Sequence, residues 1–239
     1  MNKTPRVLGI LGGLGPMASV YFYELLTKHT KAARDQDHID VIINSRATTP
    51  DRTAYILGQS TENPFDIMEA DAHRLVTFGA EVLAIPCNTA HYFYDRILPF
   101  VDIPFLSMID ETAKVISDRG LRKVGLLATD GTLQTAVYEK AFKKRGISIM
   151  VPPPENQVHI MDLIYNGVKA GNKEIDTKPT KKTIEDLFRK GAQTLVLGCT
   201  ELPVAFDLYG FDYPKTDPTL ILASRAVQFV GAKVKKEYL

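Results

Sequence analysis

Short apolar stretches alternate with longer segments of helical periodicity along the chain. Five of the apolar stretches are six residues long and stand near a Gly, Pro, Asn or Asp, which is typical of buried parallel strands. They comprise residues 6–11, 40–45, 81–86, 123–128 and 194–199. Four segments between them carry helical patterns, at residues 16–34, 63–79, 132–145 and 180–191. The alternation predicts an α/β fold with a parallel sheet flanked by helices on both faces.

The most polar segment of the chain is expected to be a loop. Residues 165–182 read YNGVKAGNKEIDTKPTKK and contain few apolar positions. Because this segment lies inside the second half of the pattern, we expect a surface connection there rather than a linker between domains.

Two pairs of segments indicate that the chain repeats itself. RVLGILGGLGPM at 6–17 aligns without a gap with RKVGLLATDGTL at 122–133, and both keep an Arg, two Gly and a Leu at the same places. GAEVLAIPC at 79–87 aligns in the same way with GAQTLVLGC at 191–199. Since the two segments are almost equally far apart in each half, we interpret the halves as a duplication.

The chain has two cysteines, and both end a repeated segment. Cys87 and Cys199 each follow a predicted strand. Parallel α/β sheets place their ligands at the carboxyl ends of the strands. The duplication therefore predicts that the two thiols lie on opposite walls of one cleft.

Composition and charge limit the kinds of partner. With 239 residues and 45% apolar content, the chain can bury a core as one large domain or two small ones. Its 29 basic and 28 acidic residues nearly cancel, so we expect a small-molecule partner and neither nucleic acid nor a membrane surface. No apolar run reaches the roughly 20 residues that span a bilayer. The glycine-rich start is not expected to be a signal peptide, because its second copy is internal, and we expect a cytoplasmic protein with free thiols.

The spacing of the thiols favours proton transfer over other cysteine chemistry. The sequence has no Cys-x-x-Cys and no Cys/His cluster with the short spacings of a zinc site. A nucleophilic pair of Cys87 with His91 leaves Cys199 without a role, and His91 stays unassigned. Two matching thiols suit racemisation, in which a base removes the α-proton on one face while an acid delivers a proton on the other. A thiol pKa near 8.5 lets a cysteine serve in either state once its surroundings lower that value.

The chain carries three motifs, IPCNTAH at 85–91, VLGCTELP at 196–203 and GILGGLGPMAS at 9–19. Together they resemble those of the aspartate/glutamate racemase family, in particular its cofactor-independent aspartate racemase branch. The resemblance implies two pseudo-symmetric α/β domains with the active site between them, a homodimer, and no cofactor such as pyridoxal phosphate. The corresponding division is 1–108 plus 216–239 for the first domain, to which the C-terminal helix returns, and 109–215 for the second.

The same resemblance implies roles for individual residues. Cys87 and Cys199 look like the two proton carriers. Asn88, Thr89 and Thr200 look like the groups that hold the α-carboxylate of the substrate, with help from the amides of the following helix starts.

Four further positions complete the expected site. Arg52 and Lys169 are similar to the residues that grip the side-chain carboxylate in aspartate racemases. Leu14 lies in the first glycine-rich turn, whose amides are expected to line the cleft. Glu201 stands where the glutamate racemase branch has a histidine, and it is a possible auxiliary to Cys199. That branch also has Asp-Ser near the first glycines, where this chain has Gly-Pro at 15–16.

Other interpretations of the sequence stay open. GLGPMA at 13–18 fits the G-x-G-x-x-A form of a dinucleotide-binding turn, and Asn44, Ser45 and Arg46 at the second strand are compatible with an NADP-dependent reductase. A non-catalytic two-lobed amino-acid binding protein is a third possibility, which leaves the thiols idle. Taken separately, each cysteine is compatible with a small core residue.

The repeat and the resemblance together favour a two-domain racemase that acts on a small acidic amino acid. Aspartate is the expected substrate, with glutamate or a broader range left open.

Overall fold

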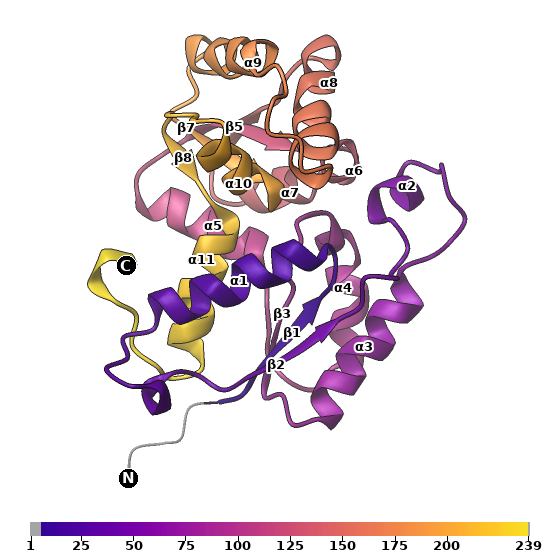
Figure 1. The fold of residues 1–239 in the computed structure, drawn as a ribbon, viewed down its shortest axis with the longest axis vertical. Coiled ribbons are helices and arrows are strands. Elements are labelled where there is room, and N and C mark those ends of the chain that lie inside the picture. Colours follow the sequence, from indigo (N-terminus) through magenta and orange to yellow (C-terminus); the bar gives the residue numbers. More distant parts are fainter. Residues whose placement is uncertain (1–5, 239) are drawn as a thin grey trace.

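Two parallel sheets of four strands each form the frame of the molecule (Figure 1). The computed structural model describes residues 6–238. The first sheet has the order β2-β1-β3-β4 and comprises β1 (Leu8–Gly12), β2 (Val41–Ser45), β3 (Val82–Ala84) and β4 (Phe105–Leu106). The second has the order β6-β5-β7-β8 and comprises β5 (Lys123–Ala128), β6 (Ser148–Met150), β7 (Thr194–Gly198) and β8 (Lys215–Thr216). The predicted fold class is confirmed.

The two sheets repeat one topology, as the sequence repeat predicts. β1 pairs with β2 and β3, and β5 pairs with β6 and β7, in each case in parallel. The repeated cysteines follow β3 and β7, which occupy the same place in their sheets. The carboxyl ends of corresponding strands therefore carry corresponding residues.

Helices cover both faces of the first sheet. Its apolar side chains enter two separate clusters, one on each face, because successive residues of a strand point to opposite sides. α1 (Pro16–His29) and α11 (Pro218–Phe229) pack on one face. α3 (Phe65–Thr77), the 3₁₀ helix η2 (Thr89–Phe93) and α4 (Tyr94–Ile97) pack on the other.

The second sheet is covered in the same way. On one face pack α5 (Met108–Asp118) and α7 (Val137–Lys143). On the other pack α8 (Pro154–Asp162), the π-helix η4 (Leu163–Lys169), α9 (Lys178–Arg189) and α10 (Glu201–Leu208). Two short helices, α2 (Arg52–Ile56) and α6 (Asp130–Thr135), lie against each other between the two halves.

α11 connects the two halves of the chain. It follows β8 of the second sheet in sequence, yet it packs beside α1 on the first sheet (Figure 1). The division into domains 1–108 plus 216–239 and 109–215 remains our proposal, and this packing supports it.

The repeated glycines mark places where side chains pack closely against the central strands β1 and β5. A Cβ on Gly9 would lie 2.7 Å from the Ala80 side chain, and one on Gly125 would lie 2.9 Å from Leu195 and 3.2 Å from Leu187. Only a residue without a side chain fits at both places. This close packing accounts for two of the identities that reveal the repeat.

Several predicted boundaries are corrected by the structure. The helix expected at 16–34 ends at His29, because the following residue, Thr30, is extended and bridges to Val234. The helix expected at 132–145 is two helices separated by Ala136, whose φ of 51° is left-handed. The segment expected to be a loop at 165–182 is helical to Lys169 and again from Lys178.

Short elements were not predicted from the pattern. β4 and β8 have two residues each, and β6 has three. Such strands are shorter than the window in which a period becomes visible. Within residues 6–238, no helix combines the length and the apolar character that crossing a membrane requires.

Candidate active site

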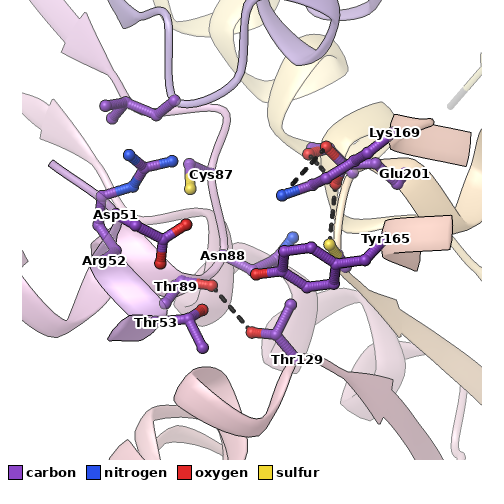
Figure 2. A pocket seen from close by; sticks show the side chains of 13 residues that line it. Asp51, Arg52, Thr53, Cys87, Asn88, Thr89, Thr129, Tyr165, Lys169 and Glu201 are labelled. Carbon is purple, nitrogen blue, oxygen red and sulfur yellow. Dashed lines mark hydrogen bonds and ion pairs between the residues drawn. The ribbon is translucent and has the colours of Figure 1, made fainter. Parts of the chain in front are cut away.

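A small cavity lies where the carboxyl ends of the two sheets face each other (Figure 2). All nine residues named from the sequence line it: Leu14, Arg52, Cys87, Asn88, Thr89, Lys169, Cys199, Thr200 and Glu201. Four further lining residues were missed: Asp51, Thr53, Thr129 and Tyr165. The structure thus brings the predicted site residues of both halves together.

The first wall is built from the turn that follows β3. Cys87 and Asn88 are buried there, at 6% and 2% exposure. His91 Nε2 accepts a hydrogen bond from the Met108 amide at 3.0 Å, so Nδ1 carries the proton and donates to the Cys87 carbonyl oxygen at 2.9 Å. Burial lowers the pKa of His91 to about 4, which keeps the ring neutral. His91 therefore holds the cysteine loop in place and is not among the residues that line the cavity.

Asn88 and Thr89 are held by side chains of the second half. The Tyr138 hydroxyl donates to Asn88 Oδ1 at 2.5 Å. Thr89 Oγ1 lies 3.1 Å from Thr129 Oγ1 and 2.9 Å from Thr132 Oγ1, and the dashed line in Figure 2 marks the first of these contacts. These buried hydrogen bonds join the two halves at the floor of the cavity.

The second wall carries Cys199 in a hydrogen-bonded network. The Cys199 thiol donates to Glu201 Oε2 at 2.9 Å. Lys169 Nζ lies 4.0 Å from the other carboxylate oxygen of Glu201 and 4.3 Å from the centre of the Tyr165 ring. Figure 2 shows Lys169, Glu201 and Tyr165 on the side of the cavity opposite Cys87 and Arg52.

The two thiols have different electrostatic surroundings. Burial raises the pKa of Cys87, and the Arg52 guanidinium and the Ala90 amide partly offset that rise. Burial raises the pKa of Cys199 well above its ordinary value, and the Glu201 carboxylate adds to the rise, both by its charge and by accepting the thiol proton. Both pKa values are thus raised, that of Cys199 more strongly, because Cys199 has the Glu201 carboxylate beside it whereas Cys87 has the Arg52 guanidinium nearby.

Arg52 reaches the cavity from the first turn of α2. Asp51 caps this helix by accepting from the Ala54 amide at 2.8 Å. Arg52 Nη1 donates to the carbonyl oxygens of Thr49 and Pro50, at 3.2 and 2.9 Å. Its buried Nε has no hydrogen-bond partner among the described residues. The guanidinium is therefore anchored on one side and free to bind a ligand on the other.

Arg46, the other arginine of this region, is committed to a structural pair. Its Nε and Nη2 donate to the two carboxylate oxygens of Asp71 at 2.7 and 2.9 Å. Asp71 is buried, and its second cationic partner is Arg74. Arg46 is not among the residues that line the cavity.

The π-helix η4 supplies two residues to the cavity, Tyr165 and Lys169, although this segment is expected from the sequence to be a loop. Its wider turn brings Tyr165 and Lys169 to the cavity together. Burial of Leu163 and Ile164 anchors the helix. Burial raises the pKa of Tyr165, and although burial lowers that of Lys169, the Glu201 carboxylate raises it overall. Lys169 thus carries its positive charge toward the cavity.

The first glycine-rich turn is already engaged by its own helix. The Gly13 amide donates to Ser19 Oγ at 2.9 Å. A Cβ on Gly13 would meet the Arg46 backbone at 2.3 Å, and the φ of Gly13 is +82°. Close packing of the turn therefore explains this glycine, without a dinucleotide. Leu14, the next residue, is buried and lines the cavity.

Several proteins that resemble this chain are amino-acid racemases. Over 231 residues the chain is 26% identical to the broad specificity amino-acid racemase RacX of Bacillus subtilis, with 92% of this chain and 96% of that protein covered. The structure of the Picrophilus torridus aspartate racemase is similar with a TM-score of 0.81 and 33% identity, covering 98% of this chain and 97% of that one. At 18% identity and a TM-score of 0.66, a glutamate racemase of Francisella tularensis shares the fold over 96% of this chain and 82% of its own.

These similarities define the class first: the protein is an isomerase of the amino-acid racemase type. The sequence profile described as Asp/Glu/Hydantoin racemase matches residues 11–226, so the chain belongs to that family. The resemblance inferred from the three motifs is confirmed. Membership in this family does not support the reductase and binding-protein alternatives.

Proposed function

We propose that this protein interconverts the enantiomers of a small acidic amino acid, aspartate in the first place, with Cys87 and Cys199 as the two proton carriers. The observation that carries the proposal is that two buried thiols, from equivalent turns of the two halves, line one cavity. A cysteine buried only for packing has no reason to recur at equivalent places on both walls of one cavity.

The proposed reaction moves one proton on each face of the α-carbon. One cysteine, as a thiolate, removes the α-proton and becomes a thiol, while the electron pair stays on the α-carbon and its carboxylate. The other cysteine, as a thiol, then donates its proton from the opposite face and becomes a thiolate. The product is the opposite enantiomer, the enzyme ends with its two protonation states exchanged, and the reverse reaction uses the same residues in exchanged roles.

The charges around the thiols support distinct resting states for them. Glu201 accepts the proton of Cys199 in a hydrogen bond and so favours the acid form. Arg52 lowers the pKa of Cys87 against the effect of burial. We infer that Cys87 gives up its proton more readily than Cys199, so that Cys87 is the first to act as the base and Cys199 as the acid.

The remaining lining residues match the groups of an acidic amino acid. We assign the α-carboxylate to Asn88, Thr89 and Thr200. Thr200 is the N-cap residue of α10, so the N-terminus of that helix also faces the carboxylate. The Asp51 carboxylate faces the cavity in Figure 2 and suits the α-ammonium.

A second carboxylate is needed to make use of the two cations. Arg52 and Lys169 line opposite sides of the cavity, and a planar guanidinium can hold a carboxylate with two parallel hydrogen bonds. An aspartate side chain supplies that group. The name of the Bacillus subtilis relative indicates a broad specificity for that protein, so glutamate and neutral amino acids belong in the test panel.

The test is to incubate each pure enantiomer of aspartate with the protein in deuterated water, without any added cofactor. We expect racemisation, with deuterium at the α-carbon of the product, because the thiols exchange their protons with solvent. Cys87→Ser and Cys199→Ser should each abolish racemisation while the circular dichroism spectrum and melting temperature stay near those of the wild type. Racemisation at a nearly normal rate by either variant contradicts the two-cysteine mechanism.

Assembly and location are further proposals. The homodimer implied by the resemblance is supported by exposed apolar side chains beside the cavity: Met17 is 73% exposed and Val20 57%. Light scattering of the purified protein tests for twice the 26.6 kDa mass of the chain. A cytoplasmic location agrees with two free thiols and is tested by fractionation of the source cells.

A further inference from the structure

Tyr138 is a completely buried tyrosine that no step of the proposed reaction uses. It is the second residue of α7, in the second half of the chain, and its exposure is 0%. Its hydroxyl donates to the side-chain oxygen of Asn88, fifty positions away on the first wall of the cavity. Burial raises the pKa of Tyr138 well above its ordinary value, so the hydroxyl keeps its proton and stays a donor.

This hydrogen bond decides which way the Asn88 amide faces. A primary amide has an acceptor oxygen at one corner and a donor NH₂ group at the other. With Oδ1 engaged by Tyr138, the NH₂ group must point away from it. Asn88 Nδ2 is buried and has no hydrogen-bond partner among the described residues. A buried donor without a partner beside a cavity is suited to an anionic ligand.

The backbone around Tyr138 is shaped for this contact. Ala136 separates α6 from α7 with a φ of 51°, a conformation that is costly for a residue with a side chain. The turn lets α7 take a different direction from α6. Thr129, the N-cap residue of α6, and Thr132 within that helix contact Thr89. The second half therefore holds both members of the Asn88–Thr89 pair.

We propose that Tyr138 is a positioning residue, which aims the Asn88 NH₂ group at the α-carboxylate of the substrate through its hydrogen bond across the two halves. The inference rests on the proposed function, since it assigns Asn88 to that carboxylate. It adds that a side chain of the second half positions the turn after β3 in the first half for substrate binding. Every amino-acid substrate has an α-carboxylate, so the effect of Tyr138 is independent of the substrate side chain.

The test is Tyr138→Phe, which removes one hydroxyl and keeps the ring in its packing. We expect kcat/KM for aspartate to fall about tenfold, because the amide loses its orientation and Oδ1 loses its partner. Tyr94→Phe is the matched control. It removes a hydroxyl that donates to the Phe105 carbonyl oxygen at 2.5 Å, outside the set of cavity residues. This control should keep the wild-type kcat/KM.

A double-mutant cycle separates positioning from a general structural effect. In an Asn88→Ala background, Tyr138→Phe should lower kcat/KM for aspartate by less than about twofold, since the amide that Tyr138 positions is gone. In an Arg52→Ala background, the same change should again cost about tenfold. Weak activities in both backgrounds are measurable as α-deuterium incorporation by NMR. Equal losses in the two backgrounds overturn the proposal.

A structural measurement tests Tyr138 even if the protein racemises no amino acid. The side-chain NH₂ signals of Asn88 are assigned in ¹⁵N-labelled protein by their absence from Asn88→Ala. We expect Tyr138→Phe to shift or broaden them, while Tyr94→Phe leaves them in place. Unchanged Asn88 signals in a folded Tyr138→Phe variant refute the positioning role. Absent racemisation by the wild type refutes only the proposed function.

Discussion

Arg52 offers a direct test of why the cavity should select an acidic substrate. Alanine and aspartate present the same ammonium, carboxylate and α-hydrogen, and they differ in the second carboxylate. Arg52 is tied to two backbone carbonyl oxygens through Nη1, so its buried and unpartnered Nε and its Nη2 remain for that group. The structure therefore offers one fork of two parallel charged hydrogen bonds.

The expected loss on changing Arg52 to alanine follows from those two bonds. A hydrogen bond to a charged group contributes about 1.5 to 3 kcal/mol. Lys169 remains on the opposite side and water enters the vacated space, so part of that energy is retained. We expect kcat/KM for aspartate to fall by about 10- to 100-fold, equivalent to about 1.4 to 2.8 kcal/mol. Arg52→Lys should recover part of the loss, since it keeps the charge without the fork.

The assay compares initial rates for aspartate and alanine, followed by α-deuterium incorporation so that slow turnover is visible. Alanine should be converted poorly by both enzymes, with no comparable penalty from Arg52→Ala. Arg46→Ala is the control, because Arg46 is bound to buried Asp71 outside the cavity. It should lower the free energy of unfolding by about 1 to 3 kcal/mol while preserving the aspartate-to-alanine ratio, since Arg74 still pairs with Asp71.

Two results refute this reasoning. A normal aspartate-to-alanine ratio in Arg52→Ala means that Arg52 does not select the substrate. If instead Arg46→Ala loses aspartate activity while the protein stays folded, Arg46 and not Arg52 selects the substrate.

Two further predictions concern titration. Glu201→Gln removes the charge that, after burial, raises the pKa of Cys199. The pH profile of kcat, measured at saturating concentrations of each enantiomer, should move to lower pH in the direction in which Cys199 is the base. Equal shifts of kcat in both directions contradict the assignment. The second prediction concerns His91, whose pKa falls to about 4 in the folded state from an unfolded value near 6.5. Between these two pH values the unfolded state binds more protons than the folded state. The free energy of unfolding should therefore decrease as the pH falls from 6.5 to 4, by up to about 3 kcal/mol. Urea unfolding of His91→Asn from pH 7 to pH 4 should show a shallower decline than the wild type, and an equal decline contradicts a neutral buried His91.

Local patterns in the sequence were sufficient for the frame of this protein. Five strands, the parallel α/β class and the duplication follow from short apolar runs, turn residues and repeated glycines. Each of these signals depends only on residues that are close together in the sequence. The two cysteines were placed correctly at the ends of equivalent strands, because parallel strands carry their following residues to the same edge.

Tertiary structure decided the contacts that join the halves. Thr129 and Tyr138 were not predicted from the sequence, and only the facing of the two sheets brings them to Thr89 and Asn88. Lys169 lies in a segment that reads as a loop, because the buried residues that hold its π-helix precede the polar stretch.

Arg46 and Arg52 show most plainly what the local sequence could not predict. Nothing in the local sequence separates Arg46 from Arg52, whereas in the fold one is bound by Asp71 and the other is anchored with its Nε free beside the cavity. Periodicity reports burial within one element. Which side chains meet depends on how separate elements pack, and that information resides in the whole chain.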